Sequence, residues 1–241
     1  MATLNITIPV YNEESALPKS IDKLYDFLSE KMKDYDWHIV IVDNASTDDT
    51  MKVGKELIKK YSRVKVIHLS QKGRGRAVKK TWQDSGADIC SYMDVDLSTD
   101  LNHFRSLITS LSNGYDIAIG SRLARGAHVQ GRTLKREIMS RCYNILIKIL
   151  FWTKFSDAQC GFKAVNRRVV ENLIPIIQDN EWFFDSELLI VGEKIGYKIF
   201  EVPVTWVDDL GTTVKIVRTA GGDLQGLLRL FLTEPWKKNN A

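Results

Sequence analysis

The chain has 241 residues, 44% of them hydrophobic, which is enough for the core of one domain of ordinary to large size. The net charge is only +4 and no nucleic-acid-reading motif accompanies the basic residues, so no nucleic-acid partner is expected. The cysteines Cys90, Cys142 and Cys160 are widely spaced, which argues against a zinc site or a disulfide framework and favours reduced thiols in a cytosolic compartment.

The first half of the chain alternates between strand and helix patterns. The predicted strands are Leu4–Val10, His38–Asp43, Val64–Leu69, Ile89–Asp94 and Ile117–Gly120. The predicted helices are Leu17–Met32, Asp48–Tyr61, Gly75–Ser85 and Leu101–Leu111. This alternation indicates an α/β fold of the Rossmann-like kind, with a mostly parallel central sheet flanked by helices on both faces.

The second half begins with a basic loop at 122–135, and no linker rich in Pro, Gly or Ser divides the chain. Residues 160–165 and Lys198–Trp206 are predicted to be strands. Helices are predicted at Arg136–Phe151, Arg167–Ile177, Phe184–Ile195 and Asp223–Leu232, with a loop at Gly211–Gly222. We therefore expect one domain over residues 1–232 and a C-terminal tail at 233–241.

Two apolar stretches, Ile145–Trp152 and Leu227–Leu232, are much shorter than the roughly 20 residues that span a bilayer. Each belongs either to a helix packed on the core or to an amphipathic helix that lies in a membrane interface. The sequence also runs directly into its first predicted strand, so no signal peptide is expected before the fold.

Two aspartates, Asp94 and Asp96, follow the apolar run 89–93. Ligands of open α/β sheets bind outside the carboxyl ends of the strands. Two carboxylates one residue apart repel each other unless a cation lies between them or one is protonated. Oxygen-only ligands suit Mg²⁺ or Mn²⁺, so we predict a divalent ion that bridges Asp94 and Asp96 to a phosphate.

Other polar residues end neighbouring strands at the same predicted edge. Asp43 ends the second strand, and Pro9, Tyr11 and Glu13 lie at the end of the first. An acid at this edge commonly accepts hydrogen bonds from a ribose, although each acid could instead cap the next helix. The convergence of these residues with Asp94 favours the contact with a ligand.

Two basic segments suit phosphate groups. The turn Lys72-Gly73-Arg74-Gly75-Arg76 opens a predicted helix, where glycines and the helix N-terminus favour an anion. Residues 122–141 hold six basic side chains against the single acid Glu137, a patch suited to phosphate or to an anionic membrane surface. Either segment taken alone could be a solvated basic face. The six are Arg122, Arg125, Arg132, Lys135, Arg136 and Arg141.

The D-x-D-x-[ST] pattern at Asp94 also opens the site of aspartate-nucleophile phosphatases, where the first acid attacks phosphate and the second is the general acid. In those enzymes the pattern usually ends the first strand, whereas here it ends the fourth. The downstream acid pair would be Asp208-Asp209, which does not end a clear buried strand. The phosphatase alternative is therefore disfavoured.

Together, the segments Tyr11-Asn12-Glu13, 43–48 and Asp94-Val95-Asp96 resemble the inverting family-2 glycosyltransferases with the nucleotide-sugar-binding GT-A fold. The resemblance covers about residues 4 to 230. Within that family the chain is similar to the polyprenyl-phosphate glycosyltransferases, especially the dolichyl-phosphate β-glucosyltransferases and mannose synthases. The segments behind this narrower resemblance are Gly120-Ser121-Arg122, Arg132, Arg136, Ser140, Asp157-Ala158-Gln159-Cys160-Gly161-Phe162-Lys163 and residues 182–189.

The resemblance implies roles for individual residues, with a nucleotide-binding half at about 1–120 and an acceptor-binding half at about 121–232. The metal Mg²⁺ or Mn²⁺ would be held by Asp94 and Asp96. The nucleotide sugar would be bound by Pro9, Tyr11, Glu13, Asp43, Lys72, Arg74, Asp94 and Gln159. The acceptor phosphate would be bound by Arg122, Arg132, Arg136, Ser140 and Lys215. The catalytic set would be Asp94, Asp96, Asp185, Arg122 and Arg136.

The implied reaction transfers a sugar to a dolichyl or undecaprenyl phosphate by a protein peripheral on the cytoplasmic face of a membrane. UDP-glucose is the favoured donor, with GDP-mannose and UDP-N-acetylhexosamine left open. A phosphate acceptor is already anionic at pH 7, so Asp185 would orient the sugar rather than act as an obligatory base. A family-2 enzyme with a hydroxyl acceptor would need Asp185 as the base, and a nucleotide-sugar binding module is the non-enzymatic alternative.

The chain departs from the resemblance in three places. Many relatives carry transmembrane helices, which this sequence lacks. In the family, a segment late in the catalytic domain usually has an arginine shortly before Gly-Ser-Lys. Here that segment reads Val207-Asp208-Asp209-Leu210-Gly211-Thr212-Thr213-Val214-Lys215. The late contact with the phosphate would therefore be made by Lys215 or Arg218. Ser98 stands where some relatives have a longer polar metal contact, so the metal would hold more water.

Overall fold

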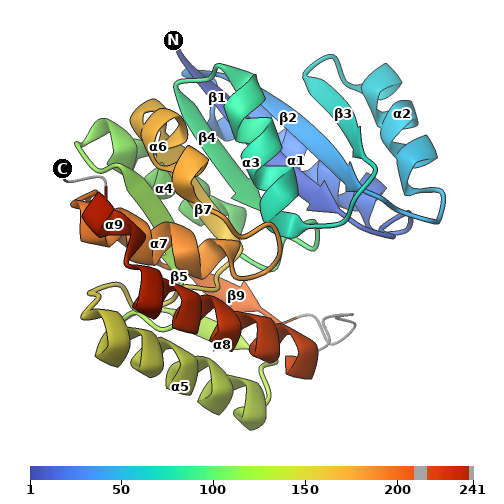
Figure 1. Ribbon diagram of the computed structural model, residues 1–241. Helices are drawn as coiled ribbons and strands as arrows, with labels where there is room; N and C mark the ends of the chain where they lie inside the picture. The colour runs from blue at the N-terminus through green and yellow to red at the C-terminus, as the bar shows by residue number, and fades with distance from the viewer. Residues whose placement is uncertain (209–215, 239–241) are drawn as a thin grey trace.

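The computed structural model describes residues 1–208 and 216–238, and among these a seven-stranded mixed sheet forms the centre of the molecule (Figure 1). The strand order is β3-β2-β1-β4-β7-β5-β8. Strands β3, β2, β1 and β4 are parallel to one another, as are β5 and β8, whereas β7 is antiparallel to both of its neighbours. The prediction of a mostly parallel α/β sheet is confirmed.

The strands of this sheet are β1 (Ala2–Val10), β2 (Tyr35–Asn44), β3 (Val64–Leu69), β4 (Ile89–Met93), β5 (Ile117–Ser121), β7 (Phe162–Asn166) and β8 (Ile199–Pro203). A separate two-stranded sheet pairs β6 (His128–Gln130) with β9 (Thr205–Val207). All five residues of β4 and of β5 are buried, because helices cover both faces of the sheet.

Helices pack on both faces of the sheet and enclose two hydrophobic clusters. One face is covered by α1 (Leu17–Lys31), α2 (Thr50–Lys60) and α4 (Phe104–Ser112), the last preceded by a 3₁₀ turn at Leu101–His103. The other face is covered by α3 (Arg74–Ser85), α6 (Arg167–Asn172), a 3₁₀ turn at Ile174–Ile176 and α7 (Phe184–Ile195).

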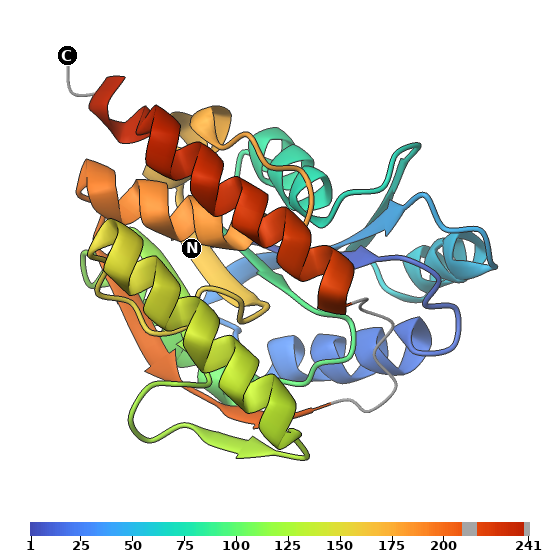
Figure 2. The ribbon, with the colours of Figure 1, turned by 60° about the horizontal axis from the view of Figure 1, so that its bottom comes forward.

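Two long helices, α5 (Leu134–Phe151) and α8 (Ile216–Thr233), lie side by side outside α7, and a short helix α9 (Pro235–Lys238) follows (Figures 1 and 2). In the described part of the chain, no helix combines the length and the apolar character needed to cross a membrane. The expected tail at 233–241 includes Thr233, the last residue of α8, and helix α9, whose Trp236 packs edge-to-face on Phe151.

Several predictions about the second half were wrong in detail, among them the single helix at Arg167–Ile177, which is α6 followed by a 3₁₀ turn. The segment Lys198–Trp206, predicted as one strand, is broken after Pro203 into β8 and β9, which belong to different sheets. The loop predicted at Gly211–Gly222 is helical from Ile216, while residues 211–215 lie outside the described residues. The basic loop at 122–135 contains β6, because its main chain pairs with β9 rather than with water.

Candidate functional site

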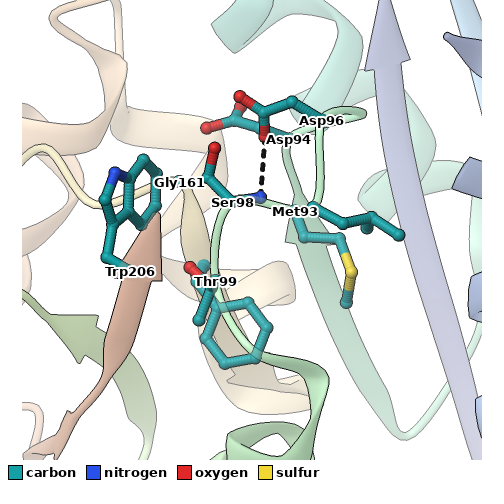
Figure 3. A pocket seen from close by; sticks show the side chains of 9 residues that line it. Met93, Asp94, Asp96, Ser98, Thr99, Gly161 and Trp206 are labelled. Carbon is teal, nitrogen blue, oxygen red and sulfur yellow. Dashed lines mark hydrogen bonds between the residues drawn. The ribbon is translucent and has the colours of Figure 1, made fainter. Parts of the chain in front are cut away.

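The two aspartates Asp94 and Asp96 lie directly after β4, at the carboxyl edge shared by β1 and β2. Leu97 adopts a positive φ of 49°, which turns the chain so that the Ser98 amide donates to Asp96 Oδ1 at 3.0 Å. Figure 3 shows both carboxylates directed to the same side of a small pocket, with the Ser98 hydroxyl pointing toward them. Gly161 and Trp206 complete the wall of this pocket.

Gly161 creates room for the Asp94 carboxylate. A Cβ atom at position 161 would lie 1.9 Å from Asp94 Oδ2, so glycine alone fits at this close approach. In the part of the chain that the structure describes, no group of three or more His, Cys, Asp or Glu residues could hold a metal ion by itself. Asp94 and Asp96 nevertheless offer the hard oxygen ligands that Mg²⁺ and Mn²⁺ prefer, provided that water and the phosphates of a ligand supply the rest.

Arg74, predicted for the nucleotide side, connects Asp94 with Asp185. Its Nη2 lies 2.7 Å from Asp94 Oδ1, and its Nη1 lies 3.5 Å from Asp185 Oδ2. The guanidinium also lies over the rings of Tyr92 and Trp182, at 5.1 and 4.9 Å from their centroids. Burial raises the pKa of Asp94 to about 6, and Arg74 opposes this rise while the nearby carboxylates add to it.

Asp185 lies in the first turn of α7 and is buried. Lys163 Nζ is 2.9 Å from Asp185 Oδ1, and the Tyr92 hydroxyl donates to the same oxygen. The sequence analysis included Lys163 in a motif without giving it a role and did not single out Tyr92. A lysine within the apolar strand pattern of Phe162-Lys163-Ala164-Val165 was the available signal, since a lysine is rarely buried without a partner.

On the predicted nucleotide side, Tyr11 and Lys72 lie together. Lys72 Nζ is 3.3 Å from the centroid of the Tyr11 ring, and a hydrogen bond from Lys72 lowers the pKa of the Tyr11 hydroxyl. Pro9 lies near the end of β1, opposite Val42 of β2. The main-chain amide of Glu13 donates to Thr50 at 2.8 Å, which fixes the turn after β1 against the start of α2.

Asp43 is buried and already has protein partners. Its Oδ1 accepts from the Ser46 amide at 3.1 Å, and its Oδ2 lies 2.6 Å from His68 Nδ1. The first contact stabilises the turn before α2 but does not cap that helix, whose N-cap residue is Asp49. The second adds His68 of β3 to the residues at the edge that is predicted to bind the nucleotide.

The predicted acceptor arginines each pair with an acid. Arg122 binds Asp157 through two nitrogens at 2.7 and 2.9 Å. Arg136 Nη1 lies 2.6 Å from Asp208 Oδ2, and Arg132 Nη1 lies 3.1 Å from Glu137 Oε2. These pairs hold the side chains at fixed positions.

Two contacts relate the arginines to the aspartate pocket. Arg122 lies 5.0 Å from the centroid of the Trp206 ring, and Trp206 lines the pocket of Asp94 and Asp96. Burial, and after it the charge of Arg122, lower the pKa of Arg132. Trp206 therefore connects Arg122 with the pocket of Asp94 and Asp96.

The remaining predicted acceptor residues differ in their placement. Ser140 of α5 is buried, and its hydroxyl has no hydrogen-bond partner among the residues that the structure describes. Lys215 lies outside the described residues, and the side chain of Arg218 is likewise not described. The late phosphate contact of the sequence analysis therefore stays a prediction.

Gln159 contacts a residue that the sequence analysis missed. Its Nε2 donates to Oδ2 of Asp223 on α8 at 3.0 Å. Asp223 is buried, and burial, together with the charges of Asp179 and Asp185, raises its pKa to about 7. An acid on the inner face of a predicted amphipathic helix was the signal that could have identified it.

Helices α5 and α8 carry apolar side chains that no part of the described chain covers. The residues recur at helical spacing, so they form a stripe on each helix. We call them the α5/α8 apolar surface. They are Leu134, Ile138, Ile145 and Ile149 on α5 and Leu224, Leu228, Phe231 and Leu232 on α8. Exposed apolar patches of this kind mark sites of contact with a protein, a ligand or a membrane.

Comparison with known proteins identifies relatives over nearly the whole chain. Glycosyltransferase AglD from Haloferax volcanii is 30% identical over 95% of this chain, and dolichyl-phosphate beta-glucosyltransferase from Dictyostelium discoideum is 31% identical over 85%. This chain spans only 37% and 66% of the lengths of these two proteins.

The fold is that of GT-A enzymes. Glucosyl-3-phosphoglycerate synthase from Mycobacterium tuberculosis, crystallised with Mn²⁺, UDP-glucose and phosphoglyceric acid, superimposes with a TM-score of 0.68. The match covers 98% of this chain and 80% of that one at 14% identity. Residues 5–174 match the description Glycosyl transferase family 2. The chain therefore belongs to glycosyl transferase family 2. This is the family that was predicted from the acids at the strand ends, Asp43, Asp94 and Asp96, and from the motif at residues 159–163.

Proposed function

We propose that this protein transfers glucose from UDP-glucose to a polyprenyl phosphate, with inversion at the anomeric carbon, at the cytoplasmic face of a membrane. The observation that carries the proposal is the position of Arg122, whose side chain is 11% exposed, beside the pocket of Asp94 and Asp96, with Trp206 contacting both. A carboxylate pair suits a metal diphosphate, and an adjacent arginine suits a second phosphate group.

On the donor side, Asp94 and Asp96 would hold Mg²⁺ or Mn²⁺, which as a Lewis acid neutralises the charge on the leaving diphosphate. The Mn²⁺ and UDP-glucose in the mycobacterial structure support this choice of donor and ion. Pro9, Tyr11, Glu13, Asp43 and Lys72 form the edge that would bind the uridine.

On the acceptor side, an oxygen of the lipid phosphate would attack the anomeric carbon in line with the departing UDP. The new bond joins that oxygen to the sugar, the bond from the sugar to the diphosphate breaks, and UDP carries away the electron pair. A phosphate monoester has a second pKa of about 6, so this nucleophile is largely a dianion at pH 7. Arg122, Arg132 and Arg136 would offset its repulsion from the donor diphosphate.

The contacts of Asp185 favour a phosphate acceptor over a hydroxyl acceptor. One of its oxygens accepts from Tyr92 and pairs with Lys163, and the other faces Arg74. A carboxylate engaged in this way is a poor base for a hydroxyl group, whereas a phosphate nucleophile needs no base. A family-2 transferase with a hydroxyl acceptor is therefore the second candidate.

The α5/α8 apolar surface supports a lipid acceptor. It lies on the two helices that carry Arg136 and Ser140, which are predicted to bind the acceptor phosphate, and Asp223. An amphipathic helix whose apolar side chains enter the boundary of headgroups and acyl chains would place these residues at the level of a lipid phosphate. The dolichyl-phosphate beta-glucosyltransferase relative supports the same class of acceptor.

A transfer assay tests the proposal. Purified protein would be incubated with radiolabelled UDP-glucose, GDP-mannose or UDP-N-acetylglucosamine and with dolichyl or undecaprenyl phosphate, in Mn²⁺, Mg²⁺ or EDTA. We expect a lipid-linked β-glucoside from UDP-glucose, no product in EDTA, and no product from Asp96→Asn.

Other outcomes would identify another function. The absence of lipid-linked sugar from every donor would refute a polyprenyl-phosphate transferase. Transfer to a hydroxyl acceptor, with a pH–rate profile governed by one carboxylate, would identify the second candidate. Tight binding of a nucleotide sugar without transfer or hydrolysis would indicate a binding module.

A further inference from the structure

Lys163 is a fully buried lysine whose charge the proposed reaction does not use directly. It lies on β7 directly opposite Tyr92 of β4, so both side chains project from the same face of the sheet toward α7. Its Nζ lies within hydrogen-bond distance of Asp185 Oδ1 (2.9 Å), the Ala158 carbonyl (3.0 Å) and the Cys160 carbonyl (2.6 Å). The Tyr92 hydroxyl oxygen lies further away, at 3.4 Å, so the three nearer acceptors suit the three protons of the ammonium group.

Lys163 begins a chain of charges that ends at the aspartate pocket. Lys163 binds Oδ1 of Asp185, Oδ2 of Asp185 faces Arg74, and Arg74 binds Oδ1 of Asp94. Two cations and two carboxylates alternate, so the group of four is neutral overall. Without the ammonium group, Arg74 would be the remaining cation on Asp185, which would draw the guanidinium away from Asp94.

The same ammonium group also shapes the loop beneath the pocket. The carbonyls of Ala158 and Cys160 belong to the segment that leads to Gly161, on which the Asp94 carboxylate lies. The Asp94 amide donates to the Gly161 carbonyl at 3.2 Å. Both the side chain and the main chain of Asp94 therefore depend on groups that Lys163 holds.

We infer that Lys163 is a positioning residue that acts through Asp185 and Arg74 to orient Asp94 for the metal diphosphate. This inference rests on the proposed metal site and extends it by one layer of residues. Partners that orient a metal ligand typically change metal affinity or activity by about 10- to 100-fold when they are removed.

The test measures Mn²⁺ binding from the electron paramagnetic resonance signal of free Mn²⁺. UDP is present in the solution, or GDP if the wild-type protein prefers it. Lys163→Met keeps the length of the side chain and removes its charge. We expect its Mn²⁺ affinity to fall by about 10-fold or more. Saturating Mn²⁺ should restore much of its kcat, a rescue that general damage to the fold would not allow.

Two further variants keep the test informative if Lys163→Met folds poorly. Tyr92→Phe removes only the hydroxyl group that donates to Asp185. It should also weaken Mn²⁺ binding. The double variant Lys163→Met/Asp185→Asn should lose less Mn²⁺ affinity than the sum of the two single losses, because both changes break the same chain of contacts through Asp185.

The matched control is Lys79→Met, since Lys79 also donates to two main-chain carbonyls, those of Ile177 and Gln178, but contacts no carboxylate of the group. Its Mn²⁺ affinity should stay at the wild-type level. Equal Mn²⁺ affinity in Lys163→Met and the wild type would overturn the positioning role of Lys163 and leave the proposed metal site standing. Additive losses of Mn²⁺ affinity in the double variant would do the same. A wild-type protein that binds no Mn²⁺ with either nucleotide would overturn the metal site as well.

Discussion

Arg122 and Asp157 form a buried ion pair with three contacts: Arg122 Nε lies 2.7 Å from Asp157 Oδ2, Nη2 lies 2.9 Å from Oδ1, and the Arg122 amide donates to Oδ2 at 3.1 Å. The pair joins the end of β5 to the segment before β7. The guanidinium holds the pKa of Asp157 at about 2 against the opposing effect of burial. The position of Arg122 beside the pocket is thus fixed by an acid 35 residues further along the chain.

Asp157→Asn should destabilise the protein strongly, because it leaves the charge of Arg122 buried without its counterion. Removing one partner of a buried pair costs about 3–5 kcal/mol in the free energy of unfolding. Urea unfolding of the wild type and the variant at pH 7 would measure the loss.

Asp34→Asn is the matched control, since Asp34 binds Arg105 through two nitrogens at 3.0 and 2.7 Å in an exposed pair. Solvent screens such a pair, so this variant should unfold almost as the wild type does. Equal effects of Asp157→Asn and Asp34→Asn would contradict a special role for burial.

The same pair predicts a dependence on acid pH. The pKa of Asp157 is lowered from 3.8 to about 2 on folding, so its ionisation stabilises the folded state above pH 4. This contribution, about 2 kcal/mol, is lost as the pH falls from 4 to 2. Unfolding free energies measured over that range should fall more steeply for the wild type than for Asp157→Asn, and identical slopes would refute the assignment.

Arg136→Ala should weaken the use of polyprenyl phosphate much more than the binding of UDP. A hydrogen bond to a charged group contributes about 1.5–3 kcal/mol, which corresponds to about a 10- to 100-fold rise in KM for the lipid acceptor. Steady-state transfer kinetics and UDP titration with Mn²⁺ would measure the two effects separately.

Arg141→Ala is the control on the same helix, because Arg141 is exposed and pairs with Glu137. It should change neither quantity by more than a small factor. Equal losses of lipid use and UDP binding in Arg136→Ala would show that Arg136 supports the whole site rather than the acceptor.

The sequence predicted the elements that repeat a local pattern. The first five strands and the acids at their ends follow from apolar runs and from the rule that parallel strands meet at one edge. The break between β8 and β9 depends on distant partners: Val204 donates to Ser121, and Thr205 accepts from Asp100. No pattern within 198–206 encodes those contacts.

The start of α8 was missed because Gly221 and Gly222 favour a loop by local propensity, yet the helix runs through both. Within the predicted part of the helix, Gly226 packs so closely on Phe183 that a Cβ atom there would lie 2.2 Å from the ring. Tertiary packing thus favours glycine at that position. Pairs such as Arg136 with Asp208, which are 72 residues apart, were equally invisible because a basic patch does not reveal its acidic partners.

The α5/α8 apolar surface predicts binding to lipid vesicles. Burying one Leu or Ile side chain contributes about 1.5–3 kcal/mol, so the double variant Ile145→Ser/Leu228→Ser should bind vesicles at least about 100-fold more weakly. Sedimentation with vesicles of mixed zwitterionic and anionic lipids would measure this. Both side chains are exposed, so the unfolding temperature should change little.

Ile58→Ser provides the control, since Ile58 is an exposed apolar residue on α2, away from α5 and α8 (Figure 1). It should leave vesicle binding unchanged. Vesicle binding that survives the double variant would exclude this surface as the membrane contact.

Asp223 predicts the opposite pH dependence from Asp157. Its pKa is raised from 3.8 to about 7 on folding, so the folded state retains a proton that the unfolded state has released. Stability therefore falls as the pH rises from 4 to 7 and changes no further above 7. A shift of this size corresponds to up to about 4 kcal/mol.

Asp223→Asn removes this proton while keeping an oxygen that can accept from Gln159, so it should be more stable than the wild type at pH 8 and equally stable at pH 4. Ionisable groups that do not interact with Asp223 affect both proteins alike, so the difference between the two unfolding curves reports Asp223 together with its coupling to Asp179 and Asp185. A constant difference across this range would mean that Asp223 is already ionised in the folded protein at pH 4. In that case burial between α8 and the Gln159 loop would not hold it neutral, and hydration of the carboxylate from the acceptor side would be the better description.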